Sequence, residues 1–142
     1  NEAIKNSSAK IIKSGSVLIA MYGATAGQSA LLKVNAATNQ AVLALTVNSK
    51  CLDNIYLYHA LSALKTDLLL SCQGSGQPNL SSTLINNFSI PVPELFIQNQ
   101  INTTLNSLLI NIDNLNLKIK RITELKKSIS SDLLSGRQRI NV

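Results

Sequence analysis

The side chains that most often perform chemistry in proteins are few and scattered in this sequence. The single histidine, His59, follows Tyr58 inside an expected helix, where a structural role is far more common than a catalytic one. Cys51 and Cys72 lack a CxxC pattern, and no two carboxylates have the spacing of a metal or acid/base site. We therefore expect a chain that is not an enzyme and that holds no metal and no cofactor.

One glycine-containing stretch, Tyr22–Gly27, has a faint likeness to a phosphate-binding loop. It lacks the lysine and the GxGxxG spacing with which such loops hold phosphate, so we do not expect a nucleotide there. Gly23, Gly27, Gly74 and Gly76 are better explained as turn formers than as ligand contacts. With so few groups able to do chemistry, the sequence favours a binding or scaffolding role.

The positive charge of the chain is concentrated at one end. The formal net charge is +6, and after residue 117 the sequence has seven basic side chains and only two acidic ones. The basic residues are Lys118, Lys120, Arg121, Lys126, Lys127, Arg137 and Arg139. A basic helix end can be a solvated face that suits the helix dipole, or a surface for phosphates or a docking partner, and both interpretations stay open.

The elements expected in the first third of the chain are strands. The compact apolar run Val17–Met21 predicts a buried strand, and Gln28–Val34 predicts a second strand antiparallel to it. Gln40–Val47 is rich in β-branched and apolar residues and predicts a third strand. The connections between them are expected to be a turn at Tyr22–Gly27 and a loop at Asn35–Asn39.

Two helices are expected next. Asp53 or Asn54 is a suitable N-cap for a helix whose apolar positions extend to Leu68. After a glycine-rich loop, Ser81 or Ser82 caps a second, short helix. The spacing of the apolar residues predicts that most of them belong to the core.

A short final strand is expected at Phe88–Ile90, ended by Pro91–Pro93 because proline fixes φ and removes a hydrogen-bond donor. Pro93 lies just ahead of a long helical segment, where proline is tolerated best. The expected fold class is α+β: a small globular domain with a few β-strands and short helices, followed by one long C-terminal coiled-coil helix. The expected boundaries are residues 1–93, 94–136 for the helix, and 137–142 for a basic tail.

The long helix is predicted by apolar residues that recur at alternating spacings of three and four. They are Ile101, Leu105, Leu108, Ile112, Leu115, Ile119, Ile122, Ile129 and Leu133. Lys126 occupies one step of this ladder, and Leu109, Leu117 and Leu125 widen it. Such a repeat is typical of a helix that packs against another helix, from the same protein or from a second copy. At about 1.5 Å per residue, Ile97–Leu133 would extend about 55 Å.

The sequence gives no sign of a membrane segment. No apolar run approaches the roughly 18 residues needed to span a bilayer, and the first residues lack the apolar region of a signal peptide. Together with two cysteines expected to be reduced, this favours a cytoplasmic protein.

Seven short stretches, taken in order, carry a resemblance to a known family. They are Ser14–Ile19, Tyr22–Gly27, Thr38–Val42, Gly74–Ser81, Ile90–Pro93, Gln100–Ile101 and Leu133–Arg137. No single stretch is specific, but their order and spacing cover nearly the whole chain. They resemble the second half of a target recognition domain, with the helix that follows it, in the DNA-sequence specificity subunit of Type I restriction–modification enzymes.

The resemblance implies a non-catalytic subunit that reads double-stranded DNA. In that family, two recognition domains each read one half of a split target, and long helices that pack antiparallel set the distance between the halves. Domains and helices also dock the methyltransferase subunits and, through the complex, the restriction subunit. The resemblance covers one domain without its N-terminal portion. The chain would therefore be a C-terminal piece of a subunit, or a half-size subunit that pairs with itself.

Polar side chains on the loops of the globular domain are the candidates for DNA contact, because Gln and Asn can read adenine and Lys can contact phosphate or guanine. The candidates are Lys10, Lys13, Tyr22, Thr25, Gln28, Gln73, Ser75 and Gln77. For each residue taken alone, a solvated or turn-stabilising role is the favoured interpretation. The main alternative function is a helical assembly or dimerisation module with little DNA specificity of its own, and an unrelated α/β enzyme is a minor one.

Overall fold

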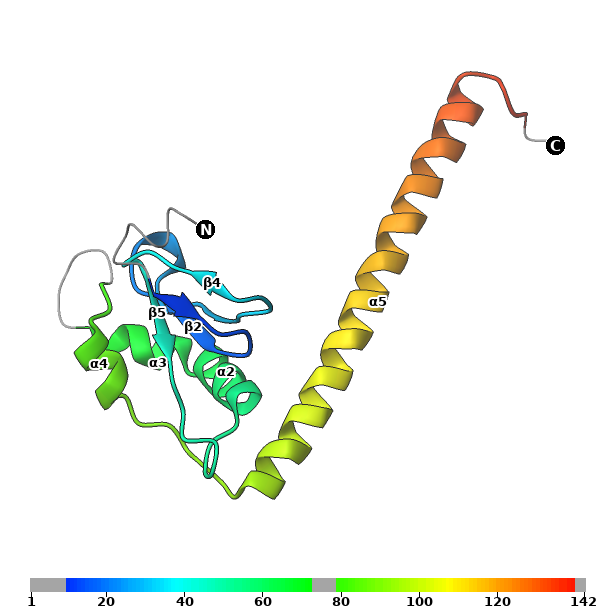
Figure 1. The fold of residues 1–142 in the computed structure, drawn as a ribbon. Coiled ribbons are helices and arrows are strands. Elements are labelled where there is room, and N and C mark those ends of the chain that lie inside the picture. Colours follow the sequence, from blue (N-terminus) through cyan, green and yellow to red (C-terminus); the bar gives the residue numbers. More distant parts are fainter. Residues whose placement is uncertain (1–9, 73–78, 140–142) are drawn as a thin grey trace. The chain divides into compact units, whose positions relative to one another are not determined.

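Figure 1 shows the chain as a computed structural model that describes residues 10–72 and 79–139. By its internal contacts the chain divides into two compact units, Asn1–Asn102 and Thr103–Val142. The first unit contains the strands and the short helices, and the second contains most of one long helix. The expected α+β class is confirmed.

The centre of the first unit is a three-stranded antiparallel sheet with the strand order β3-β2-β5. Its strands are β2 (Val17–Ala20), β3 (Ser29–Leu31) and β5 (Val42–Leu45). Val17 lies opposite Leu31 on one side and Leu45 on the other. All three predicted strands are therefore confirmed, each shorter than its apolar run.

A second, two-stranded sheet joins β1 (Ile11–Ile12) to β4 (Ala36–Ala37) in antiparallel register. The prediction of a loop across residues 35–39 is wrong at these two alanines. Small side chains without β-branching gave no strand signal, and only pairing with a distant partner makes this segment extended.

The predicted helix from Asp53 to Leu68 is present but divided. Asp53 is the N-cap of α2 (Asn54–Ala63), and α3 (Lys65–Leu70) follows after Leu64, whose ψ of 13° departs from helical geometry. Because of this break, the two helices pack against different parts of the core. Leu57 and Leu61 of α2 join one apolar cluster, whereas Leu68 of α3 joins the other.

Ser81 caps the short helix α4 (Ser82–Asn87) by accepting a hydrogen bond from the backbone N–H of Leu84, as predicted. The strand predicted at Phe88–Ile90 is wrong, because none of these three residues takes part in a β-sheet. Its apolar side chains still pack: Phe88 lies against one core cluster and Ile90 against the other. Burial alone accounts for its alternating pattern.

The core consists of two clusters that share β2. Val17 packs with Leu57 and Leu61, and Ile19 belongs to the other cluster. The other buried members of that second cluster are Met21, Leu68, Leu80 and Ile85. Val17 and Ile19 are both 0% exposed, and they lie on the same face of β2 because alternate strand residues point the same way.

The long helix α5 extends from Leu95 to Leu134 over 40 residues, which corresponds to about 60 Å. It is followed by Gly136, whose φ of +73° is the left-handed conformation that suits the residue after a helix C-cap. No helix in the described parts of the chain is long and apolar enough to cross a membrane.

Candidate nucleic-acid interface

Three of the predicted DNA contacts lie on one short connection between β2 and β3. Tyr22 precedes the 3-10 helix η1 (Gly23–Thr25), and Gln28 follows it. The backbone N–H of Gln28 donates to the carbonyl of Thr25 at 2.9 Å, so the turn has its own hydrogen bonds. Tyr22, Thr25 and Gln28 are all exposed. The fold therefore brings them together at one end of the hairpin.

The same connection is held against α3 by a close approach at Gly27. This glycine has a φ of +76°, and a Cβ built on it would lie 3.3 Å from side-chain carbons of Leu69 and Lys65. Both the backbone conformation and the space favour glycine here. The prediction that Gly23 and Gly27 are turn formers is confirmed, since both have positive φ.

Lys13 lies at the opposite end of the hairpin, just before β2. The hydroxyl of the adjacent Ser14 donates to the carbonyl of Lys33 at 2.9 Å, and the Ser14 backbone N–H donates to Asn35 Oδ1 at 2.8 Å. The backbone of Lys33 therefore lies beside Ser14, the neighbour of Lys13, and both lysine side chains are exposed. Sequence reasoning missed Lys33, because its position beside Ser14 follows from the register of the hairpin.

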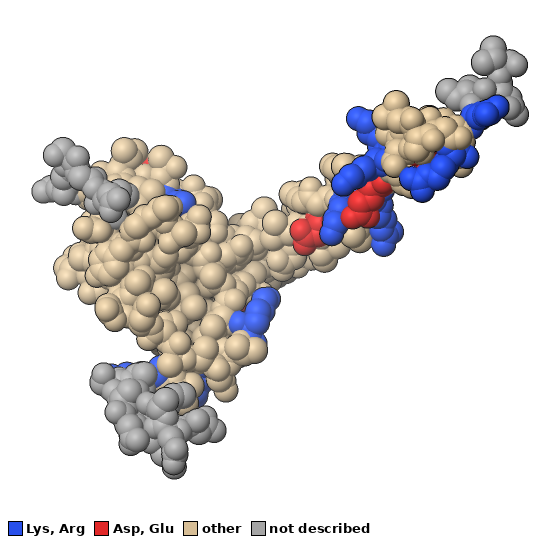
Figure 2. Space-filling model, turned by 90° about the horizontal axis from the view of Figure 1, so that it is seen from above, with Lys and Arg blue, Asp and Glu red and all other residues tan. Residues whose placement is uncertain are grey.

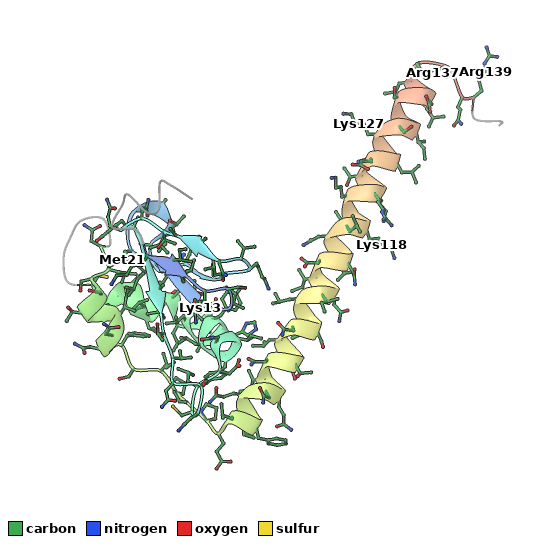
Figure 3. The ribbon with its side chains drawn as sticks, viewed as in Figure 1. Lys13, Met21, Lys118, Lys127, Arg137 and Arg139 are labelled. Atoms are coloured by element: carbon green, nitrogen blue, oxygen red, sulfur yellow. The ribbon has the colours of Figure 1, made fainter. Side chains whose placement is uncertain are left out.

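The predicted contacts consequently form two groups rather than one surface. The four residues of β2 separate the groups by about 13 Å, and Figure 3 labels Lys13 and Met21 beside the two ends of that strand. Lys10 is exposed at the start of β1, one short strand away from Lys13. Gln73, Ser75 and Gln77 lie outside the described residues.

Seven of the thirteen lysines and arginines lie in the second unit, five of them on α5 and two just after it. Figure 2 shows the lysines and arginines gathered toward the C-terminal end of the helix, among few acidic residues. Arg137 Nε lies 3.5 Å from Asp132 Oδ1, with the arginine side chain largely exposed. Within the described residues, no three His, Cys, Asp or Glu side chains come together as metal ligands.

The most constrained polar side chain belongs to Gln98 in the first turn of α5. It is 0% exposed, and its Oε1 accepts a hydrogen bond from the backbone N–H of Asp53 at 2.8 Å. Its Nε2 donates to the carbonyls of Cys51 at 2.8 Å and Pro93 at 2.7 Å. One amide thus joins the loop before α2, the proline segment and the start of α5.

A second amide extends this network one turn later. Asn102 Nδ2 donates to Asp53 Oδ1 at 2.7 Å, and the same carboxylate oxygen caps α2 through the N–H groups of Ile55 and Tyr56. The Tyr56 hydroxyl donates to the Pro91 carbonyl at 2.8 Å. The first two turns of α5 are therefore fixed to the N-terminus of α2 by polar contacts.

Sequence reasoning did not single out Gln98 or Asn102. A signal was available for Gln98, which lies three residues before Ile101 and so continues the ladder of threes and fours toward the N-terminus. A glutamine at a ladder position that is otherwise apolar indicates burial with a specific hydrogen-bond partner.

The predicted helix-packing residues have two different surroundings. Ile101 and Leu105 are half-buried, whereas the later ladder residues are between 38% and 62% exposed. The exposed members are Leu108, Ile112, Leu115, Ile119, Ile122, Ile129 and Leu133. An apolar stripe of this length is rarely left in water. That a second helix covers it stays a prediction.

Comparison with protein families gives a match over most of the chain. The model of the family described as "Type I restriction modification DNA specificity domain" matches residues 1–125. A relative, the Type I restriction enzyme MjaVIII specificity subunit of Methanocaldococcus jannaschii, is 26% identical over 125 residues. The match covers 88% of this chain and 29% of that protein, so the chain spans about three tenths of its length.

Solved structures share the fold. An S subunit of a Type-I restriction-modification system from M. genitalium superposes with a TM-score of 0.69 at 19% identity, covering 89% of this chain and 34% of that one. The HsdS subunit from Thermoanaerobacter tengcongensis gives 0.63 at 20% identity, covering 87% and 30%. A chain from a structure that describes complex assembly of the type I R-M system gives 0.69 at 22% identity, covering 83% and 29%.

Proposed function

The chain belongs to the family of Type I restriction modification DNA specificity domains, and on that premise we propose that it reads one half of a bipartite DNA target. It does so as a non-catalytic specificity subunit, or as part of one, in a Type I restriction–modification complex. Its partners are double-stranded DNA, the methyltransferase subunits and, through the complex, the restriction subunit. Such a subunit would act in the cytoplasm.

The observation that carries the proposal is the family match, which includes both the globular unit and most of α5. The match is supported by the two properties that a spacer helix needs. Gln98 and Asn102 fix the start of the helix to the globular unit, and the remainder presents an exposed apolar stripe.

The length of the stripe also supports the proposal. From Leu108 to Leu133 the helix rises about 38 Å. Half-sites one turn of DNA apart are separated by about 34–36 Å. A helix fixed to one reading domain and paired with a second helix could therefore define such a separation, which a flexible linker could not.

The hairpin is the proposed reading element of the globular unit. Tyr22, Thr25 and Gln28 at one end offer hydroxyl and amide groups for base edges, and Lys13 and Lys33 at the other end offer charge for phosphates. Together they would engage the duplex along the length of β2 and β3.

A selection from a random duplex pool tests this function. We expect the chain to enrich a short sequence at low salt, and we expect its affinity to fall steeply as salt rises. Tyr22→Ala and Gln28→Ala should change the enriched sequence. Lys13→Ala and Lys33→Ala should weaken all duplexes alike and lower the salt slope by about 1 each.

Lys50→Ala is the matched control, since Lys50 is also exposed but lies in the loop between β5 and α2, where it lines a surface pocket with Pro93 and Glu94. A pool without enrichment at low salt would contradict autonomous reading by this chain. It would favour the second candidate function, an assembly module. Two observations favour that second function: the exposed apolar stripe of α5, and the seven basic residues against two acidic ones after residue 117.

A further inference from the structure

One lysine interrupts the apolar ladder of α5. The ladder positions form two rows, each with a spacing of seven residues. The first row is Gln98, Leu105, Ile112, Ile119, Lys126 and Leu133, and the second row is Ile101, Leu108, Leu115, Ile122 and Ile129. Lys126 is thus the single charged residue of either row, and it lies near the end of the exposed part.

The row positions decide what Lys126 would meet if two copies of α5 paired through the ladder. In an antiparallel pair the first row faces the second row, so Lys126 meets leucine or isoleucine in every register. In a parallel pair the first row faces itself. Lys126 then meets another apolar residue or the Lys126 of the second copy. Gln98 is not available, because its amide is already hydrogen-bonded within the globular unit.

The acidic residues of α5 would not neutralise the charge of Lys126 in such a pair. Asp113 and Glu124 lie at helix positions that point away from the ladder face. Asp132 flanks the last ladder residue and is paired with Arg137. In addition, Lys118 flanks the ladder one turn after Leu115, so the flank adds positive charge.

A self-pair of α5 would therefore place an ammonium group in an apolar seam without a carboxylate. Burying a charge without a partner is strongly unfavourable, and a lysine avoids it only by bending its head group out to water. A helix that presents a carboxylate opposite Lys126 would remove this cost and would be preferred over a second copy.

We propose that Lys126 selects the partner of α5: it disfavours pairing with a second copy of this chain and favours a different helix with an acidic side chain opposite it. This rests on the proposed function, in which α5 pairs with another helix. Of the two partners left open by the sequence, a homodimer mate and a non-identical helix, the charge pattern favours the second.

The first test compares two adjacent lysines with the same substitution. Lys126→Leu restores a continuous apolar ladder, whereas Lys127→Leu adds the same side chain off the ladder. Lys127 projects from the opposite side of α5 to Lys118 in Figure 3. We expect Lys126→Leu to tighten self-association at least about tenfold in sedimentation equilibrium, with Lys127→Leu like the parent chain.

Equal self-association of the parent chain and Lys126→Leu would overturn the proposal, as would equal effects of the two leucine variants. Circular dichroism verifies that all three chains keep α5. Both substitutions lie in the second unit, so the change in mass reports on pairing by the helix.

The second test asks whether a carboxylate is what Lys126 prefers. The parent chain is mixed with Lys126→Glu, which places an acid opposite Lys126 in an in-register parallel pair. It is also mixed with Leu115→Glu, which does so in the antiparallel register that overlaps the two exposed stripes completely, with Leu108 opposite Leu133. Lys126→Gln and Leu115→Gln are the neutral controls. We expect one glutamate variant to pair with the parent chain, and the pairing to weaken with salt.

If neither glutamate variant pairs better than its glutamine control, selection by charge is wrong. Neither test contains DNA, so the outcome is separate from the duplex selection. A chain that enriches a DNA sequence but shows no effect at Lys126 would keep the proposed function and lose this inference.

Discussion

The two ends of α5 use the same helical repeat for opposite purposes. At Gln98 the ladder position is fully buried, polar and saturated with three hydrogen bonds. From Leu108 onward the equivalent positions are apolar and exposed. The spacing of the ladder therefore identifies which face of the helix makes contacts. The residue type at each ladder position indicates whether those contacts are within the chain or with another helix.

The largest effect is expected from a substitution of Gln98. Gln98→Leu keeps the size of the side chain but leaves the Asp53 N–H and the carbonyls of Cys51 and Pro93 without their partner. An unsatisfied buried group costs about 1–3 kcal/mol, so we expect a loss of about 3 kcal/mol in the free energy of unfolding. Urea denaturation followed by tyrosine fluorescence measures it.

Tyrosine is a suitable probe because all three tyrosines, Tyr22, Tyr56 and Tyr58, lie in the first unit and the chain has no tryptophan. The matched control is Asn106→Leu, at an exposed position two turns later on the same helix. If Gln98→Leu changes the free energy by less than about 0.5 kcal/mol, as a surface substitution would, the buried amide does not fix the helix.

A smaller effect is expected at the other side of the same network. Asp53→Ala removes the N-cap of α2 and the acceptor of the Asn102 amide. Loss of a cap costs about 1 kcal/mol, and the orphaned amide adds to it, so we expect a loss of about 2 kcal/mol in total. Asp53→Asn keeps an oxygen acceptor and should recover at least half of the loss in the same denaturation measurement.

The control for this pair is Asp67→Ala. Asp67 is an exposed residue in the first turn of α3, and its carboxylate is not an N-cap. Equal losses for Asp53→Ala and Asp67→Ala would mean that charge alone, and not the cap, stabilises the unit. Equal losses for Asp53→Ala and Asp53→Asn would mean that the capping oxygen contributes nothing.

How far the sequence predicts this structure depends on whether a signal is local. The cap at Asp53, the cap at Ser81 and the long helix α5 are decided by neighbouring residues, and all three are confirmed. That the ladder of α5 packs against another helix stays a prediction. The strand at Ala36–Ala37 depends on a partner about 25 residues away, and the break at Leu64 depends on two separate clusters. Neither has a local signal.

The candidate site divides in the same way. The sequence could place Tyr22, Thr25 and Gln28 together because they share one turn. It could not bring Lys33 beside Lys13, because that proximity follows from the hairpin register and the Ser14 hydroxyl. For Gln98 the ladder spacing favours burial, but the sequence could not identify its hydrogen-bond partners Asp53 and Cys51, which lie 45 and 47 residues away.

The smallest effect on the stability of the first unit is expected from substitutions in the exposed stripe of α5. Leu108→Lys and Leu115→Lys should change the free energy of unfolding of the first unit by less than about 0.5 kcal/mol, because these side chains are already 53% and 59% exposed. The same variants should lose pairing with a partner helix, measured as mass in sedimentation. Leu117, expected from the sequence to widen the ladder, lies about 200° around α5 from Leu115 and so on the opposite side of the helix. Leu117→Lys is therefore the matched control and should keep the pairing. A loss above about 1 kcal/mol in the tyrosine-detected transition would contradict the exposure, because it would mean that the stripe is buried within the chain. A stable first unit with lost pairing would instead separate the two uses of one ladder: polar attachment at Gln98, and an apolar surface from Leu108 onward that is complete only with a second helix.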